Sequence, residues 1–130
     1  MNLLVYTGGC TGWKNQIVSS RTNQIYQVKN GGLTCLVEDA GNVSMTDPDT
    51  LAGFIRWCGE HYPADRNSLI FWDHGGGSVS GYGYDQKFPR SGSMTLAMID
   101  KALKDGGMTF DFIGFDACLM ATMENALMLS

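Results

Sequence analysis

Residues 69–77 read Leu-Ile-Phe-Trp-Asp-His-Gly-Gly-Gly, and this stretch decides the fold. Four consecutive apolar residues that run into a polar pair and three glycines are typical of a buried strand followed by a tight loop. Strands that are apolar on both sides belong to parallel sheets whose faces are covered by helices. The stretch therefore predicts a parallel strand that delivers His74 into a glycine loop at its carboxyl end.

Strands and helices alternate along the rest of the chain. The predicted strands are residues 3–6, 24–28, 33–38, 69–72 and 110–115, and the predicted helices are 47–62, 96–105 and a segment that starts near 120. A turn at residues 30–32 joins the second and third strands as a hairpin. This order predicts an α/β fold with a mostly parallel central sheet flanked by helices.

The composition excludes several classes of protein. The chain has 130 residues, 44% of them hydrophobic and 17% charged, which is too apolar for disorder. No apolar run approaches the ~20 residues that a membrane span needs. Nine Lys and Arg against 13 Asp and Glu give a net charge of −4 without a basic stripe, so we expect no binding to nucleic acid. The first residues show no basic region or cleavage site of a signal peptide.

Four cysteines, Cys10, Cys35, Cys58 and Cys118, lack the spacing of a structural zinc site. A chain with this much apolar sequence does not need disulfides for stability, so we expect free thiols. Cys35 and Cys58 lie in apolar patterns and are expected in the core. Cys10 follows a strand and a glycine pair, which makes it a rival to Cys118 as a nucleophile.

His74 and Cys118 both follow strands, 44 residues apart. The carboxyl ends of parallel strands lie along one edge of a sheet, and neighbouring strands are only ~4.8 Å apart. A single crossover helix connects the two strands, so we expect the imidazole and the thiol to meet as a dyad. A helix that starts at Cys118 would favour the nucleophilic thiolate.

Two residues beside this pair fit the same chemistry. Gly75 lets the backbone approach a substrate carbonyl closely enough to aim an N–H at a developing oxyanion. Asp116 precedes Cys118 by two positions, so in extended backbone both side chains point to the same side. Its carboxylate could line a pocket for Lys or Arg, or it could instead cap the helix that follows.

The two segments 71–77 and 114–120 resemble the clostripain family of bacterial cysteine peptidases, relatives of caspases, legumains and gingipains. The resemblance implies a caspase-like fold of which residues 1–130 form the N-terminal part of a single peptidase domain. It also implies a general base at His74, and a nucleophile at Cys118 that forms a thioester with the substrate.

Further roles come from the same resemblance. The N–H groups of Gly75 and Cys118 would bind the oxyanion, and Asp116 would form the floor of a pocket that selects Arg or Lys. The family cleaves itself after a basic residue between its two motifs. Lys87 and Arg90 are the basic residues of the Gly-rich loop at 78–93, which we expect to be flexible.

The resemblance also bears on cofactors, partners and location. Some members of the family need calcium, although the sequence has no local acidic cluster that would define a metal site. The partners implied are peptide substrates with Arg or Lys at the cleaved bond, and the remaining C-terminal part of the same domain. A secreted or cell-surface bacterial location is likewise a family expectation.

Two other functions stay open. A catalytically silent α/β interaction module could use the exposed edge of the sheet, which a partner would complete. An esterase of the α/β-hydrolase type could use the His-Gly-Gly-Gly run as its oxyanion loop, but it needs a G-x-S-x-G nucleophile motif. The chain has no such motif, and Ser78 and Ser80 lie in the loop itself.

Overall fold

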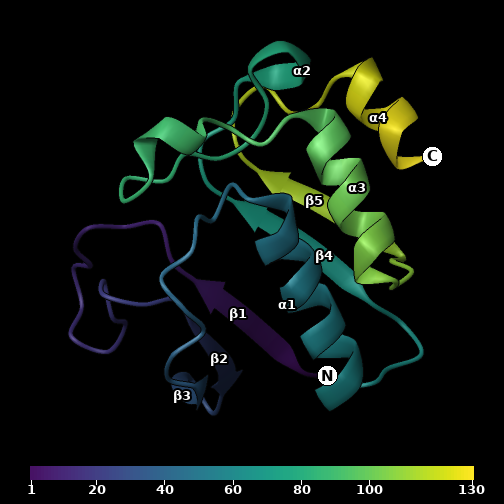
Figure 1. Cartoon of the computed structure of the whole chain (residues 1–130). Helices are drawn as coiled ribbons and strands as arrows, with labels where there is room; N and C mark the ends of the chain where they lie inside the picture. Colours follow the sequence, from purple (N-terminus) through teal and green to yellow (C-terminus); the bar gives the residue numbers. More distant parts are fainter.

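The computed structural model describes residues 1–130 and shows helices packed against strands (Figure 1). The strands are β1 (Leu3–Thr7), β2 (Gln24–Lys29), β3 (Gly32–Val37), β4 (Ser68–Trp72) and β5 (Phe112–Asp116). The helices are α1 (Pro48–His61), α2 (Gly77–Ser80), α3 (Leu96–Gly106) and α4 (Met123–Leu129), with a short 3-10 turn η1 (Pro89–Ser91).

In the structure, β4 and β5 form the parallel part of the sheet that the sequence predicts. Their register runs from Ser68 opposite Phe112 to Trp72 opposite Asp116. Helix α3 forms the crossover between them and packs against α1, and both helices lie across the front of the strands in Figure 1. The expected α/β class, with helices over a parallel pair of strands, is confirmed.

The predicted hairpin is also present and belongs to a second, antiparallel sheet. Strand β2 pairs antiparallel with both β1 and β3, so the order of this sheet is β1-β2-β3. No backbone hydrogen bonds join β1 to the β4–β5 pair, although β1 runs in the same direction in Figure 1. The strands thus form two small sheets where the sequence pattern predicts one.

Helix starts follow from local side-chain chemistry. The Asp47 carboxylate accepts the N–H of Asp49 at 2.9 Å, and Pro48 occupies the first turn of α1. In the same way, the Thr95 hydroxyl accepts the N–H of Met98 at 3.2 Å at the start of α3. Both arrangements satisfy amide groups that a helix leaves without intrahelical partners.

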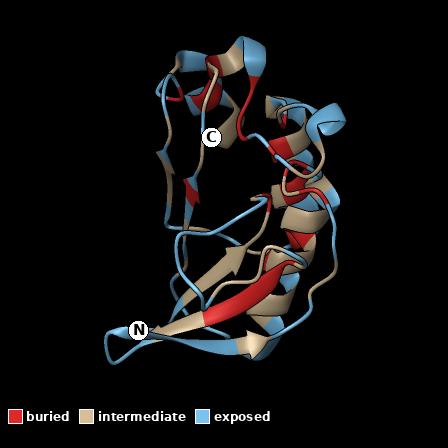
Figure 2. Ribbon diagram, turned by 90° about the vertical axis from the view of Figure 1, so that its left-hand side faces the viewer, coloured by how far each residue is buried: buried red, intermediate tan, exposed pale blue.

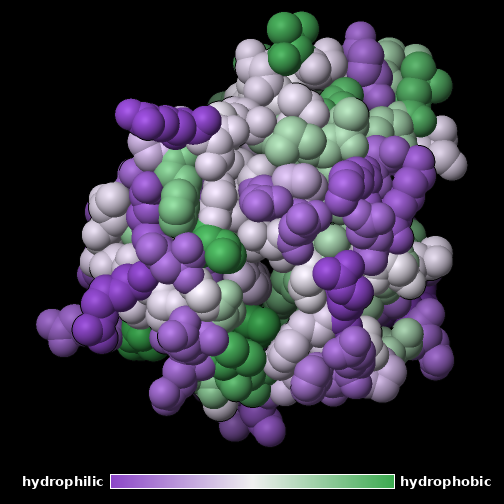
Figure 3. All heavy atoms as spheres, in the orientation of Figure 1, coloured by the Kyte–Doolittle hydropathy of each residue, from purple (hydrophilic) through white to green (hydrophobic).

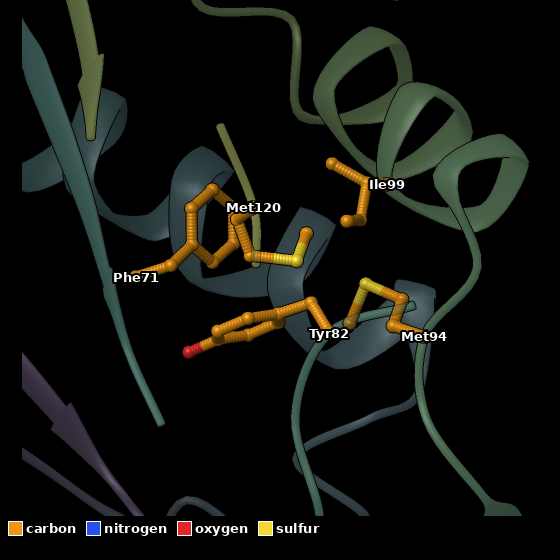
Figure 4. Packing of buried hydrophobic residues seen from close by; sticks show 5 residues of the cluster. All are labelled: Phe71, Tyr82, Met94, Ile99 and Met120. Carbon is orange, nitrogen blue, oxygen red and sulfur yellow. The ribbon is translucent and has the colours of Figure 1, made fainter. Parts of the chain in front are cut away.

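A cluster of buried hydrophobic residues lies between the parallel pair and α3 (Figure 4). It consists of the buried residues Phe71, Tyr82, Met94, Ile99 and Met120. The rings of Phe71 and Phe115 stack with their centroids 4.8 Å apart, which ties β4 to β5 through side chains as well as through the backbone. Tyr82 and Met94 come from the segment between α2 and α3, so this segment contributes to the core.

The opposite face of the parallel pair is open to solvent. Ile70, Trp72 and Phe112 expose 63%, 83% and 57% of their surface. In Figure 2, short buried stretches alternate with intermediate and exposed ones along the ribbon. In Figure 3, further hydrophobic residues are exposed over α2 and α4. Helices normally cover both faces of a parallel sheet, but no helix of this chain covers this face. None of the helices is both long enough and apolar enough to cross a membrane.

The four cysteines are free thiols in different surroundings. Cys58 on α1 is partly buried, and burial raises the pKa of its thiol to about 11. The expectation of a core position for Cys35 is wrong, because β3 is the outer strand of its sheet and Cys35 is exposed.

Candidate active site

The parallel pair brings the two predicted catalytic segments together. Trp72 and Asp116 are the last paired residues of β4 and β5. His74 and Cys118 each follow two residues later, so both leave the same edge of the sheet from neighbouring strands. A crossover of this kind places two strands side by side or one apart, and the structure has them side by side.

Gly75 lies directly against the backbone of Cys118. A Cβ atom at this position would overlap the Cys118 carbonyl oxygen and would lie 2.8 Å from the Met120 Cγ. A Cβ on Gly77, whose φ is +72°, would lie 3.3 Å from the Leu119 carbonyl oxygen. The glycine loop and the segment after Cys118 therefore pack backbone to backbone, which a side chain on Gly75 would prevent.

Several polar groups have no hydrogen-bond partner where the glycine loop meets the Cys118 segment. The N–H groups of Gly75 and Cys118 donate no hydrogen bond within the protein. His74 and Cys118 are exposed, and neither side chain makes a hydrogen bond to another residue. The two segments therefore present an imidazole, a thiol and two amide donors that have no partners within the chain.

The expected helix start at Cys118 is wrong. Helix α4 begins at Met123, and its N-cap is Thr122, whose hydroxyl accepts the N–H of Asn125 at 3.2 Å. The reason lies in the intervening turn, where Leu119 has a φ of +62° that no right-handed helix allows. The alternative role of Asp116 as a helix cap is excluded by the same geometry.

Asp116 ends β5 on the open face of the parallel pair. It is exposed, its carboxylate accepts no hydrogen bond, and its partner in register is the exposed Trp72. A carboxylate beside an aromatic ring suits a cationic side chain, which carboxylates pair with and ring faces attract.

The loop after the glycines is tied down by two carboxylates that sequence reasoning missed. Asp85 is buried, and it accepts the N–H groups of Met45 at 2.8 Å, Lys87 at 2.8 Å and Phe88 at 3.0 Å. Asp73 accepts the N–H groups of His74 and Tyr84 at 2.7 and 2.8 Å. The bonds of Asp85 to Lys87 and Phe88 are those of a local Asx turn. The bonds to Tyr84 and Met45 join residues 11 and 40 positions apart, so no local sequence pattern marks them.

The two basic residues of the loop differ in their surroundings. The Lys87 ammonium donates to the Arg21 carbonyl at 3.3 Å, and its backbone N–H is bound to Asp85. Arg90 is exposed within η1, and Gly92 two residues later has no atoms near the position of a Cβ. Arg90 is the more accessible of the two.

Cys10, the rival nucleophile, lies in the loop after β1. Its thiol donates to the Gly12 carbonyl at 2.9 Å. No hydrogen bond joins Cys10 to the His74 segment, whereas the backbone of Cys118 meets that segment at Gly75. The geometry therefore favours Cys118.

The side chains that most often bind metal ions do not cluster in the chain. No three His, Cys, Asp or Glu side chains gather so that they could hold one, and calcium needs six to eight oxygen ligands. A hollow of about 830 Å³ lies over β2 and β3, and it includes none of the predicted site residues.

Comparisons with known proteins identify relatives of the chain. The model of the clostripain family matches residues 1–129. Clostripain from Hathewaya histolytica is 32% identical over 100 residues, which cover 64% of this chain and 18% of clostripain.

Solved structures share the fold. A secreted C11 cysteine protease from Bacteroides thetaiotaomicron, in complex with an irreversible peptide inhibitor, matches 98% of this chain with a TM-score of 0.73 and 24% identity. A second structure of a secreted C11 cysteine protease from that organism, iotapain, matches 82% with a TM-score of 0.67 and 16% identity. The chain spans 35% of each of these structures. With a family match over almost its whole length, the chain belongs to the clostripain family.

Proposed function

We propose that the full-length protein is a cysteine endopeptidase that cleaves peptide bonds after Arg or Lys. The observation that carries this proposal is the register of β4 and β5, which starts the His74 and Cys118 segments from neighbouring strand ends. Membership of the clostripain family supports the same reaction.

In the first half of the reaction His74 takes the proton of the Cys118 thiol, and the sulfur attacks the scissile carbonyl carbon. The resulting oxyanion accepts hydrogen bonds from the N–H groups of Gly75 and Cys118. When the carbon–nitrogen bond breaks, His74 gives its proton to the leaving amine, and the acyl group remains on the sulfur as a thioester.

In the second half a water molecule attacks the thioester while His74 removes its proton. The carbon–sulfur bond then breaks, the acid product leaves and the His74 proton returns to the thiolate. Asp116 binds the guanidinium or ammonium group of the substrate and so sets the preference for a basic residue.

The open face of the parallel pair indicates that more of the same domain packs against it. Ile70, Trp72 and Phe112 are exposed beside Asp116, and the relatives are much longer than this chain. We infer that further chain of the same domain covers this face and supplies more of the cleft. A secreted or cell-surface location is part of the proposal, since the structural relatives are described as secreted. No step is assigned to calcium.

A silent interaction module is the second candidate, and the same open face favours it. An uncovered apolar surface also suits a partner protein. The two functions differ in whether Cys118 reacts with a substrate analogue.

Intact mass after treatment with an Arg- or Lys-directed acyloxymethyl ketone tests the proposal. We expect one label on the full-length protein, its loss in Cys118→Ala and its retention in Cys10→Ala. Asp116→Ser should slow labelling by the basic reagents and leave labelling by a neutral analogue unchanged. Absence of labelling on the wild-type protein, or labelling that survives in Cys118→Ala, would overturn the peptidase and favour the module.

A further inference from the structure

Asp73 lies between the end of β4 and His74, and its carboxylate holds two segments at once. Oδ1 accepts the N–H of His74 at 2.7 Å, and Oδ2 accepts the N–H of Tyr84 at 2.8 Å. Each oxygen thus serves a different part of the chain. The hydrogen bonds are short and charge-assisted, and such bonds are about twice as strong as neutral ones.

The backbone of His74 is held from both sides by the same loop. Its N–H is bound to Asp73, which also binds Tyr84, and its carbonyl oxygen accepts the N–H of Gly83 at 2.8 Å. The imidazole itself makes no hydrogen bond within the chain. The position of the ring therefore depends on how its backbone is held.

The loop that holds His74 is itself fixed to the rest of the fold. The buried Asp85 accepts the N–H of Met45, and the N–H of Gln86 donates to the Gly9 carbonyl at 2.8 Å. Residues 83–86 are thus anchored to the loop after β1 and to the segment before α1. An anchored loop gives Asp73 a rigid partner.

Close approach of the loop requires a residue without a side chain. Gly83 has a φ of +84°, and a Cβ there would lie 3.1 Å from the Thr46 Cγ2 and 3.5 Å from the Asp73 Oδ2. Glycine adopts this conformation without strain. The close contact between the loop and Asp73 therefore depends on the backbone conformation of Gly83.

We propose that Asp73 is a positioning residue, whose carboxylate fixes the backbone of His74 to the anchored loop at 83–86 and so orients the imidazole towards Cys118. The inference rests on the proposed function, because it assigns to Asp73 the alignment of that dyad. A carboxylate suits the task, since both of its oxygens accept hydrogen bonds, whereas the amide of Asn offers one acceptor and turns a donor towards the second N–H.

The test compares Asp73→Asn and Asp73→Ala with a matched control in the full-length protein. Asp111 is the control, because it also accepts a backbone N–H, that of Asn67 at 3.1 Å, but at the opposite end of the β4–β5 pair. Turnover of a small Arg or Lys substrate is measured per active site, titrated with the irreversible ketone. This normalisation removes any unfolded fraction from kcat.

We expect kcat to fall about 100-fold in Asp73→Ala and about 10-fold in Asp73→Asn, since small misplacements of a catalytic group cost that much. KM should change by less than about twofold, because Asp73 does not face the bound basic side chain in this assignment. Asp111→Ala should keep both constants. A kcat per site that is unchanged in Asp73→Ala, or a loss confined to the number of titratable sites, would overturn the inference. If Asp73→Ala does not fold, the kcat per site of Asp73→Asn decides between the same two outcomes.

A second measurement separates this inference from the proposed function. Wild-type protein that cleaves no basic substrate refutes the peptidase but leaves the position of His74 open to a direct test. In the Cys118→Ala background, the imidazole ¹H–¹³C NMR signals of His74 should shift or broaden on Asp73→Asn and not on Asp111→Asn. Signals that do not change would overturn the positioning role whatever the activity.

Discussion

Trp72 lies opposite Asp116 in the register of β4 and β5, and this pairing sets the geometry of the site. His74 follows Trp72 by two residues, and Cys118 follows Asp116 by two residues. The proposed base, nucleophile and specificity carboxylate thus depend on one pair of strands. A shift of register by one residue would turn their side chains to the other face.

Gly75→Ala should abolish activity and destabilise the protein. The added methyl would overlap the Cys118 carbonyl oxygen and press on Met120. Overpacking of this kind costs about 1–3 kcal/mol. Urea unfolding and turnover of the Arg substrate measure the two effects.

Gly53→Ala is the control for that substitution. Gly53 lies in α1 with open space around the position of its Cβ, so alanine should stabilise the helix by about 0.5–1 kcal/mol and keep full activity. Equal stability of the Gly75→Ala and wild-type proteins would contradict the close packing of Gly75 against Cys118.

Self-cleavage should occur after Arg90 and not after Lys87. Both peptide bonds lie in turns, since the N–H groups of Lys87 and Phe88 are bound to Asp85 and the N–H of Ser91 is bound to the Phe88 carbonyl at 2.9 Å. They differ in exposure, because Lys87 and Phe88 are partly buried while Arg90 and Ser91 are exposed. Intact mass of the purified protein should therefore show cleavage in Lys87→Gln and none in Arg90→Gln. Cys118→Ala is the control without peptidase activity. Cleavage after Lys87 in Arg90→Gln would refute the assignment.

Asp85→Asn should lower the free energy of unfolding by about 1–3 kcal/mol, because one buried amide oxygen cannot replace three accepted hydrogen bonds. The thermal midpoint measures the loss, and limited proteolysis should show faster cutting between residues 83 and 90. The exposed Asp65→Asn serves as the matched variant and should match wild type. A midpoint for Asp85→Asn that equals that of Asp65→Asn would count against the anchoring role.

Cys58 should make the protein less stable in alkaline solution. Burial raises the pKa of its thiol from 9.0 to about 11 in the folded state. Between these values the unfolded chain has lost the proton and the folded chain still holds it, so the free energy of unfolding falls as pH rises from about 9 to about 11.

Chemical unfolding at several pH values measures that loss. The fall should be smaller in Cys58→Ala, which has no thiol at this position, and unchanged in Cys35→Ala, whose thiol is exposed. Identical pH dependence of the wild-type and Cys58→Ala proteins would contradict the burial of Cys58.

Sequence alone predicted the strands, most of the helices and the two motifs that carry the proposed catalytic residues. Apolar runs and helical spacing are local signals, so the strand before His74 and the helix from Asp47 could be located from them. The single crossover helix narrowed the placement of β4 and β5 to side by side or one apart, and the structure shows that they pair directly.

Tertiary structure alone decided the features that depend on distant contacts. The left-handed turn at Leu119 delays α4 to Met123, and the outer position of β3 exposes Cys35. The hydrogen bonds of Asp73 and Asp85 connect a strand end, a loop and the segment before α1. Local patterns cannot show such bonds, because only folding brings the carboxylate next to backbone N–H groups that have no other partner.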